Sequence, residues 1–151
     1  YPEIVELLMD IPVYISEKVE GSNAGITISE IGEEFVSTRK HAILSKVEGE
    51  LASHTWWIVA KEQGVLDFAR KIKTDLNTNE KVTIYGEMVG GNIQGNIYKF
   101  PKVHVRMFDI KVGQKWLDAD QFLELTKDQL VVPVLSVGKT LREWLNGKTI
   151  Q

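Results

Sequence analysis

The stretch SEKVEGSN, residues 16–23, places Lys18 between two glutamates and shortly before Gly21. Alternating residues at 13–18 predict a strand, residues 21–23 predict a turn, and residues 25–29 predict the second strand of a hairpin. In an extended strand, Glu17 would point to the face opposite Lys18. The stretch therefore poses the question whether Lys18 is a reactive amine or a solvated charge.

A lysine amine is nucleophilic only when it is neutral, and at a reference pKa of ~10.4 about one molecule in a thousand is neutral near pH 7.4. Activation requires the pKa to fall by roughly 3 units, which corresponds to ~4 kcal/mol. A metal ion or another cation beside Lys18 would lower the pKa, and a carboxylate such as Glu20 could help to hold that ion. The plain alternative is that both residues are solvated charges flanking a turn.

Composition narrows the class of protein. The chain has 151 residues and no cysteine, which fits one domain without disulfides or a zinc–thiolate site. With 43% apolar and 26% charged residues it resembles an ordinary globular protein. The absence of a long apolar segment or a signal-peptide pattern predicts a soluble cytoplasmic protein, or one in the host cytoplasm if viral, with no membrane partner. The formal net charge is −3, so any nucleic-acid binding must come from a local surface.

Hydrophobic periodicity predicts an α+β fold with largely antiparallel sheets and flanking helices. Further strands are predicted at residues 35–39, 81–87, 103–112 and 131–137. Helical spacing covers much of residues 53–76, with a break at Gly64. Asp118 predicts the start of a helix over 119–128, and Thr140 caps a short helix that ends near Gly147.

The motifs resemble those of the covalent nucleotidyltransferases, which include ATP-dependent DNA ligases, RNA ligases and GTP-dependent capping enzymes. Their nucleophile motif is Lys-x-Asp-Gly, and residues 18–21 match it with glutamate in place of aspartate. The fuller string at 17–23 is similar to Glu-Lys-x-x-Gly-Thr/Ser-Asn of the phage-type, nick-sealing RNA ligases. Segments at 37–39, 85–87 and 107–110 resemble later motifs of that family in the family's order.

The resemblance implies an ATP-dependent RNA ligase with an ATP-grasp-like adenylation domain. Lys18 would attack the α-phosphate of ATP to form lysyl-AMP, with Mg²⁺ or Mn²⁺ as cofactor. AMP would pass to the 5′-phosphate of an RNA end or nick, and a 3′-hydroxyl would then displace it. The alternatives are a DNA ligase or capping-type enzyme of the same fold, and a catalytically inactive module that only binds nucleotides.

The resemblance also implies roles for individual residues around Lys18. Glu17 would contact the adenine edge, Glu87 the ribose, and Arg39 a phosphate or ribose oxygen. Phe108 would stack on adenine, although a half-buried strand aromatic is by default a core residue. Nucleotide binding is expected of Glu17, Val19, Asn23, Arg39, Glu87 and Phe108, and an indirect role at the metal of Glu20, Asn23 and Asp109.

Three other groups of residues have, from the sequence alone, either two possible roles or no special role. Lys99, Lys102, His104 and Arg106 form a basic cluster that fits either a nucleic-acid backbone contact or a solvated strand face. The tryptophans Trp56, Trp57 and Trp144 are predicted to lie in the core. The histidines His41, His54 and His104 lack metal-ligand spacing.

Two further motifs of the family, one with a metal-binding glutamate and one with two lysines, are not found in the chain. Residues 1–151 are therefore expected to be a partial adenylation domain, incomplete at the C-terminus, whose site requires a missing segment or a companion fragment. The absent lysines are the cations expected to lower the pKa of Lys18. Weak or no self-adenylation is predicted for these residues alone.

Overall fold

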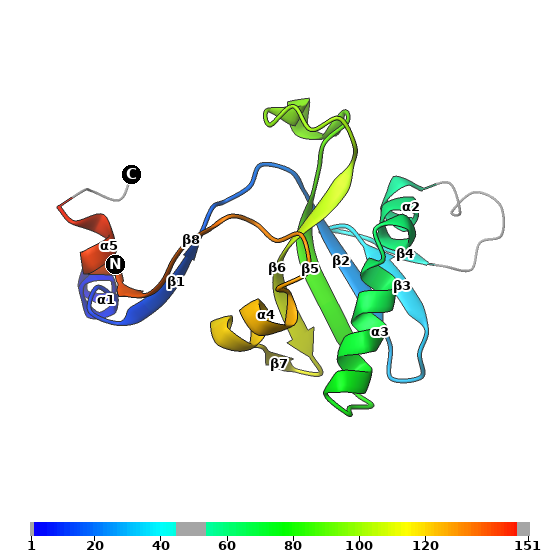
Figure 1. Ribbon diagram of the computed structural model, residues 1–151, viewed down its shortest axis with the longest axis horizontal. Coiled ribbons are helices and arrows are strands. Elements are labelled where there is room, and N and C mark those ends of the chain that lie inside the picture. Colours follow the sequence, from blue (N-terminus) through cyan, green and yellow to red (C-terminus); the bar gives the residue numbers. More distant parts are fainter. Residues whose placement is uncertain (1, 45–53, 148–151) are drawn as a thin grey trace. The chain divides into compact units, whose positions relative to one another are not determined.

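The computed structural model describes residues 2–44 and 54–147. The chain divides into two compact units, each with its own sheet (Figure 1). The sheet unit comprises Val19–Val131, and the terminal unit comprises Tyr1–Lys18 with Val132–Gln151. None of the helices in the described part of the chain has the length and apolar character needed to span a bilayer.

The sheet unit is built on a six-stranded antiparallel sheet with strand order β4-β3-β2-β5-β6-β7. Its strands are β2 (Ser22–Ile28), β3 (Glu34–Ser37), β4 (Ala42–Leu44), β5 (Val82–Val89), β6 (His104–Val112) and β7 (Lys115–Trp116). β5 pairs with β2 on one side and with β6 on the other. In the resulting register Ile26, Ile84 and Ile110 lie side by side, and all three are fully buried.

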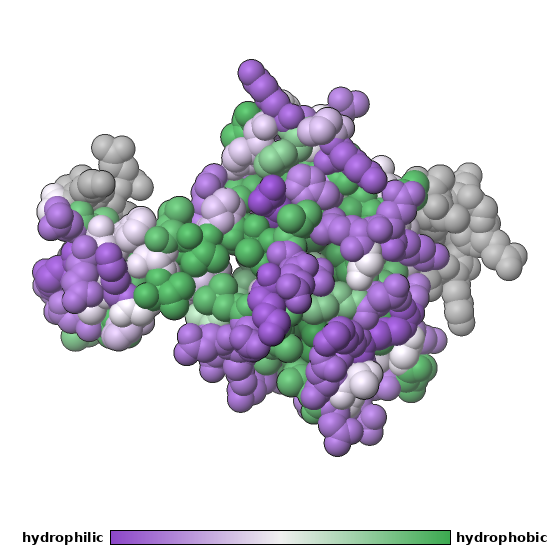
Figure 2. All heavy atoms as spheres, in the orientation of Figure 1, coloured by the Kyte–Doolittle hydropathy of each residue, from purple (hydrophilic) through white to green (hydrophobic). Residues whose placement is uncertain are grey.

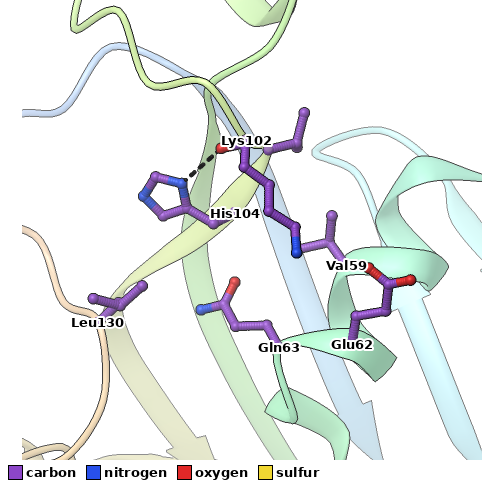
Figure 3. A pocket seen from close by; sticks show the side chains of 7 residues that line it. Val59, Glu62, Gln63, Lys102, His104 and Leu130 are labelled. Atoms are coloured by element: carbon purple, nitrogen blue, oxygen red, sulfur yellow. Dashed lines mark hydrogen bonds between the residues drawn. The ribbon is translucent and has the colours of Figure 1, made fainter.

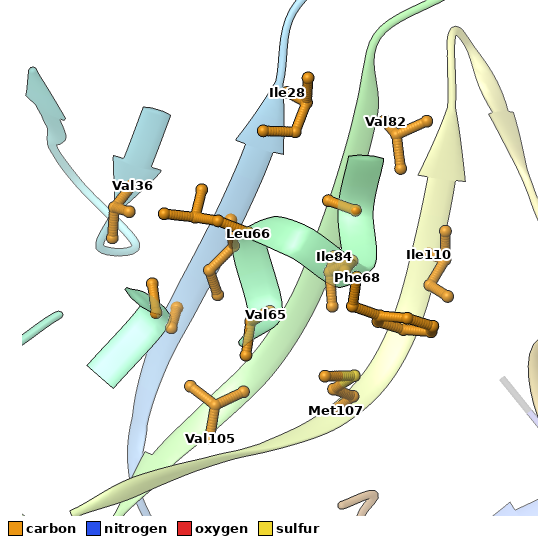
Figure 4. Packing of buried hydrophobic residues seen from close by; sticks show 14 of the residues in the cluster. Ile28, Val36, Val65, Leu66, Phe68, Val82, Ile84, Val105, Met107 and Ile110 are labelled. Atoms are coloured by element: carbon orange, nitrogen blue, oxygen red, sulfur yellow. The ribbon is translucent and has the colours of Figure 1, made fainter. Parts of the chain in front are cut away.

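Helices cover one face of this sheet. Helix α2 (Thr55–Glu62) and helix α3 (Val65–Asp75) are separated by Gly64, which has a φ of 79°, a left-handed conformation that glycine adopts without steric cost. Val65 and Leu66 of α3 are buried against the isoleucine rung and its neighbours (Figure 4). Phe122 of α4 (Ala119–Leu125) joins the same core. Helices α2, α3 and α4 thus pack on one core with the sheet.

A β-bulge interrupts the pairing of β5 with β6. Tyr85 lies opposite Asp109 and Gly86 opposite Met107, so Phe108 has no partner across the strands. The extra residue shifts the in–out alternation of side chains along β6 by one position. As a result Met107 and Ile110, three residues apart, are both buried in the core. Phe108 and Asp109 are only half-buried. The bulge thus places both side chains away from the helix-covered core.

The terminal unit pairs the two ends of the chain. Strand β1 (Pro12–Ser16) pairs antiparallel with β8 (Val134–Thr140), and helices α1 (Pro2–Leu8) and α5 (Leu141–Leu145) flank them in sequence. Arg142 donates to Asp10 Oδ1 at 2.8 Å and to Glu6 Oε1 at 2.7 Å. Hydrogen bonding from Arg142 lowers the pKa of Asp10.

The α+β class and most elements are confirmed, including the break at Gly64 and the caps at Asp118 and Thr140. The hairpin predicted from 13–18 and 25–29 is wrong, because β1 pairs with β8 and β2 pairs with β3 and β5. The turn predicted at 21–23 is also wrong, because β2 already begins at Ser22. Elements α1, β4 and β7 are not predicted by the sequence patterns, and β8 begins three residues later than expected.

The three tryptophans predicted to lie in the core differ in their surroundings. Trp57 is buried in the core as predicted, with 4% of its surface exposed. Trp56 is half-buried and packs against the edge of the core. Trp144 is 37% exposed, so its assignment to the core is wrong.

We expect Ile84→Ala to lower the free energy of unfolding by about 2–5 kcal/mol, because it leaves a cavity in the central rung of the sheet. Chemical denaturation at equilibrium measures this loss. Ile31→Ala is the matched control, because Ile31 is 81% exposed and its truncation should change stability by no more than about 0.5 kcal/mol. Equal losses in the two variants would contradict the assignment of the core.

Candidate functional site

A cavity of about 560 Å³ opens within the sheet unit, beside the first residues of β2. Its walls come from the start of β2, the β3–β4 turn, helix α2, the end of β5 and the 3₁₀ helix η2 (Ile93–Asn96). The lining residues are Gly21, Ser22, Asn23, Thr38, Arg39, Lys40, His41, Trp56, Glu87 and Gln94. The volume lies in the range usual for small-molecule sites.

Three residues that the motifs single out line this cavity, although they are far apart in the sequence. Asn23 and Glu87 are direct partners across the β2–β5 ladder, and Arg39 follows the end of β3. The backbone carbonyl of Asn23 accepts a hydrogen bond of 3.3 Å from Trp56 Nε1, which ties α2 to the wall. A carboxylate, an amide and a guanidinium thus converge on one concave surface.

Gly21 brings the chain close to the end of β5. A Cβ atom on Gly21 would lie 2.6 Å from the backbone oxygen of Met88 and 3.2 Å from Glu87 Oε2. A contact of 2.6 Å to backbone is too short for any side chain, so this approach requires glycine. Backbone packing alone therefore explains why the motif has glycine at position 21, whatever chemistry the site performs.

Phe108 and Asp109 lie on the sheet face opposite the helices but do not line the cavity. Phe108 is half-buried and is absent from the core, so the default assignment of this ring as a core aromatic is wrong. Tyr85, the cross-strand partner of Asp109, packs against Trp116 with ring centroids 5.1 Å apart. This face is therefore partly aromatic, and the adenine-stacking role of Phe108 stays a prediction.

The stretch around Lys18 has no regular secondary structure, because β1 ends at Ser16. The strand-based placement of Glu17 and Lys18 on opposite faces therefore does not apply. Lys18 and Glu20 are exposed, and Val19 is buried with 7% of its surface exposed. In the terminal unit, the Glu17 amide donates to the carbonyl of Pro133 at 2.9 Å. In the sheet unit, the Glu20 amide donates to the Tyr98 hydroxyl at 2.9 Å.

The surroundings of Asp109 shift the pKa of its carboxyl group upward. Burial raises the pKa of Asp109, and the hydrogen bond that its Oδ1 accepts from the Ile110 amide, at 2.9 Å, opposes the shift. Among the described residues, no three His, Asp or Glu side chains are grouped so as to hold a metal ion. The indirect role at a metal expected of Glu20, Asn23 and Asp109 stays a prediction.

Four residues of the cavity wall were missed by the sequence motifs. Lys40 and His41 continue directly from Arg39 and form a run of basic and imidazole side chains at the mouth. This run is visible in the sequence as three consecutive residues, although its histidine lacks metal-ligand spacing. Trp56 is predicted only as a core residue, and Gln94 carries no motif that marks it.

A model of the RNA ligase family matches residues 11–150. The chain belongs to the RNA ligase family. The match spans the stretch around Lys18 and every segment that lines the cavity. Curated protein sequences gave no match to the chain.

Solved structures of an RNA ligase from Naegleria gruberi are similar to the chain. A variant with ATP and Mn and a variant with AMP and Mn each give a TM-score of 0.74 at 20% sequence identity, covering 96% of this chain and 43% of the ligase chain. A variant without ligand matches with the same TM-score. At this identity the likeness shows the fold, and the chain spans less than half the length of these RNA ligases.

We expect Asp109→Asn to stabilise the protein in metal-free buffer at pH 7 but not at pH 3. The folded-state pKa is raised, so ionisation of Asp109 costs the folded state free energy. The cost is absent well below the unfolded value of about 3.9, grows as the pH rises, and is complete above the folded-state pKa. The asparagine can still accept the bond from Ile110. Melting temperatures measured from pH 3 to 8 check this, and a gain that is independent of pH would contradict it.

Proposed function

We propose that this member of the RNA ligase family joins RNA ends at the expense of ATP, with Lys18 as the covalent nucleophile. The observation that carries the proposal is the convergence of Asn23, Arg39 and Glu87 on one cavity. These residues come from three separate segments that the family motifs single out. A nucleotide site explains why these three polar residues line one cavity better than chance does.

Chain connectivity supports a role for Lys18 at this cavity. Only Val19 and Glu20 separate Lys18 from Gly21, which lines the cavity. Three residue steps span at most about 11 Å, even when fully extended. The Cα atom of Lys18 therefore lies within that distance of the Gly21 Cα atom, however the two units are arranged.

The proposed reaction has three displacements at phosphorus. The neutral amine of Lys18 attacks the α-phosphorus of ATP, the bond to pyrophosphate breaks, and the amine releases its proton to give lysyl-AMP. The 5′-phosphate of RNA then displaces Lys18 from AMP. Finally the 3′-hydroxyl attacks the activated 5′-phosphate and releases AMP. Holding the reacting groups in line supplies much of the rate, because it removes the entropy cost of encounter.

The wall residues have proposed tasks that suit their chemistry. Arg39 presents a fixed charge and a fork of donors to a phosphate or ribose oxygen, and Glu87 accepts hydrogen bonds from the ribose hydroxyls. Asn23, the last residue of the motif at 17–23, lies opposite Glu87 in the sheet and offers its side-chain amide to the nucleotide. Three residues that do not line the cavity are also proposed to bind the nucleotide. Glu17 contacts the adenine edge, Phe108 stacks on adenine, and Val19 contacts the nucleotide.

The metal is proposed to enter with the nucleotide, as magnesium or manganese bound to the triphosphate. Mg²⁺ keeps several waters and commonly binds through substrate phosphates with one or two carboxylates. The Naegleria gruberi RNA ligase structures with ATP and Mn are consistent with such a complex. When bound, the ion neutralises phosphate charge.

The whole reaction is proposed for the protein in which these residues act together with a segment carrying the two motifs not found here. The chain corresponds to 43% of the Naegleria gruberi RNA ligase chain, which leaves room for such a segment. Its lysines would lower the pKa of Lys18. Residues 1–151 are proposed to be one partial adenylation domain.

We expect a mass gain of one AMP on the protein that carries the additional motifs after incubation with ATP and magnesium or manganese. Intact-mass spectrometry detects the adduct, and Lys18→Ala should abolish it because no amine remains at that position. Lys81→Ala, which removes an exposed lysine elsewhere in the sheet unit, is the matched control and should label normally. Saturable ATP binding without any adduct would contradict the ligase proposal and would favour a module that only binds nucleotides.

We expect Phe108→Ala to weaken ATP binding by about 1–3 kcal/mol, the usual value of a base-stacking ring. The free energy of unfolding should change little, because the ring is half-exposed and lies outside the core. Isothermal titration and chemical denaturation measure the two quantities on the same sample. A large loss of stability with unchanged ATP affinity would assign Phe108 to packing alone.

A further inference from the structure

The hairpin between β5 and β6 carries a surface of aromatic and basic side chains that the proposed adenylation site does not use. It projects from the sheet unit at the top of Figure 1, where the colour changes from green to yellow. We call it the hairpin surface, and its members are Tyr98, Lys99, Phe100, Lys102, His104 and Arg106. Figure 2 shows hydrophilic side chains projecting from this hairpin, with smaller apolar areas between them.

The rings and the guanidinium form an ordered array. Tyr98 stacks on Phe100 with centroids 5.5 Å apart, and His104 meets Phe100 edge-on at 5.0 Å. Arg106 Cζ lies 4.9 Å from the centre of the Phe100 ring, and its Nε donates to His104 Nε2 at 3.2 Å. The array holds Arg106 in one place, so little side-chain freedom is lost when it binds an anion.

The charge of the hairpin is one-sided. Residues 88–108 contain no aspartate or glutamate, whereas the whole chain has more acidic than basic residues. Lys99 and Lys102 are exposed, and neither ammonium group takes part in an ion pair among the described residues. A net acidic protein thus presents a local positive surface, which is the electrostatic footprint of a polyanion site.

A small pocket lies beside this surface, with a volume of about 160 Å³. Lys102 and His104 line it together with Gln63, Glu62, Val59, Val103 and Leu130 (Figure 3). The side-chain amide of Gln63 is bound to β6, because it donates to the Val105 carbonyl at 2.8 Å and accepts from the Val105 backbone amide at 2.7 Å. His104 Nδ1 is bound to the Lys102 carbonyl at 3.0 Å. These contacts hold the base of the hairpin surface rigidly on the sheet.

The same hairpin reaches the cavity described above. Gln94, at its tip, lines that cavity, and its side chain contacts the Ser22 hydroxyl at 3.5 Å. The Tyr98 hydroxyl accepts from the amide of Glu20, one residue before Gly21. The segment that connects β5 to β6 therefore carries both the aromatic and basic array and a residue of the cavity wall.

We propose that the hairpin surface binds the phosphate backbone of the RNA strand that is to be joined, with Lys99, Lys102 and Arg106 as phosphate ligands. The inference rests on the proposed function, from which RNA as the partner follows. Phosphate contacts position a strand without reading its sequence. The surface thus delivers an RNA end to the adenylated site and supplies affinity that the small nucleotide cavity lacks.

The test is RNA binding by the double variant Lys99→Ala/Lys102→Ala, measured by fluorescence anisotropy from 25 to 200 mM salt with single-stranded and nicked duplex RNA. We expect binding at the lowest salt to weaken roughly 10-fold and the slope of log Kd against log salt to fall by about 1 to 2. Lys81→Ala/Lys115→Ala, which removes two exposed lysines from other parts of the sheet unit, is the matched control and should bind normally.

Formation of the AMP adduct on the same variants separates the two proposals. We expect normal labelling of the hairpin double variant, because neither lysine lines the cavity. RNA binding that is unchanged in that variant, or that falls equally in the control, overturns the hairpin surface whether or not Lys18 is labelled. Loss of labelling in the unsubstituted protein, with RNA binding still dependent on Lys99 and Lys102, overturns the proposed ligase chemistry alone.

Discussion

The antiparallel pairing of β5 with β2 and β6 is the interaction on which the sheet unit depends. It aligns Ile26, Ile84 and Ile110 in one fully buried row and thereby fixes the register of the strands. A slip of one residue would expose that row and bury polar side chains instead. The same register sets Asn23 opposite Glu87 at the end of the ladder. Stability and the candidate site thus follow from one set of hydrogen bonds.

The two faces of the sheet have different tasks, and the local geometry serves both. Helices α2 and α3 cover one face with apolar side chains, while the other keeps polar and aromatic groups accessible. Gly21, which lines the cavity, adds a close approach of its backbone to that of Met88 in β5. The polar wall is therefore supported both by this close backbone approach and by the hydrogen bond from the Trp56 side chain to the Asn23 carbonyl.

Local patterns predicted much of this arrangement, but not the partners of the strands. Alternation identified β5 and β6, and Asp118 and Thr140 identified two helix starts, because these signals are local. The partner of β1 could not be found in that way, since β8 lies at the other end of the chain and no turn connects them. The motifs single out Asn23, Arg39 and Glu87, and the structure places these three residues on one cavity. Trp56 and Gln94 join the same wall only through tertiary packing, which no motif marks.

The bulge at Phe108 separates two kinds of constraint along β6. Before and after it, Met107 and Ile110 are buried in the core, while Phe108 and Asp109 take no part in that packing. Substitutions at these two positions can therefore accumulate without disturbing the close packing of the interior. The bulge thus lets one strand serve two purposes at adjacent positions: Met107 and Ile110 fill the interior, while Phe108 and Asp109 stand outside it.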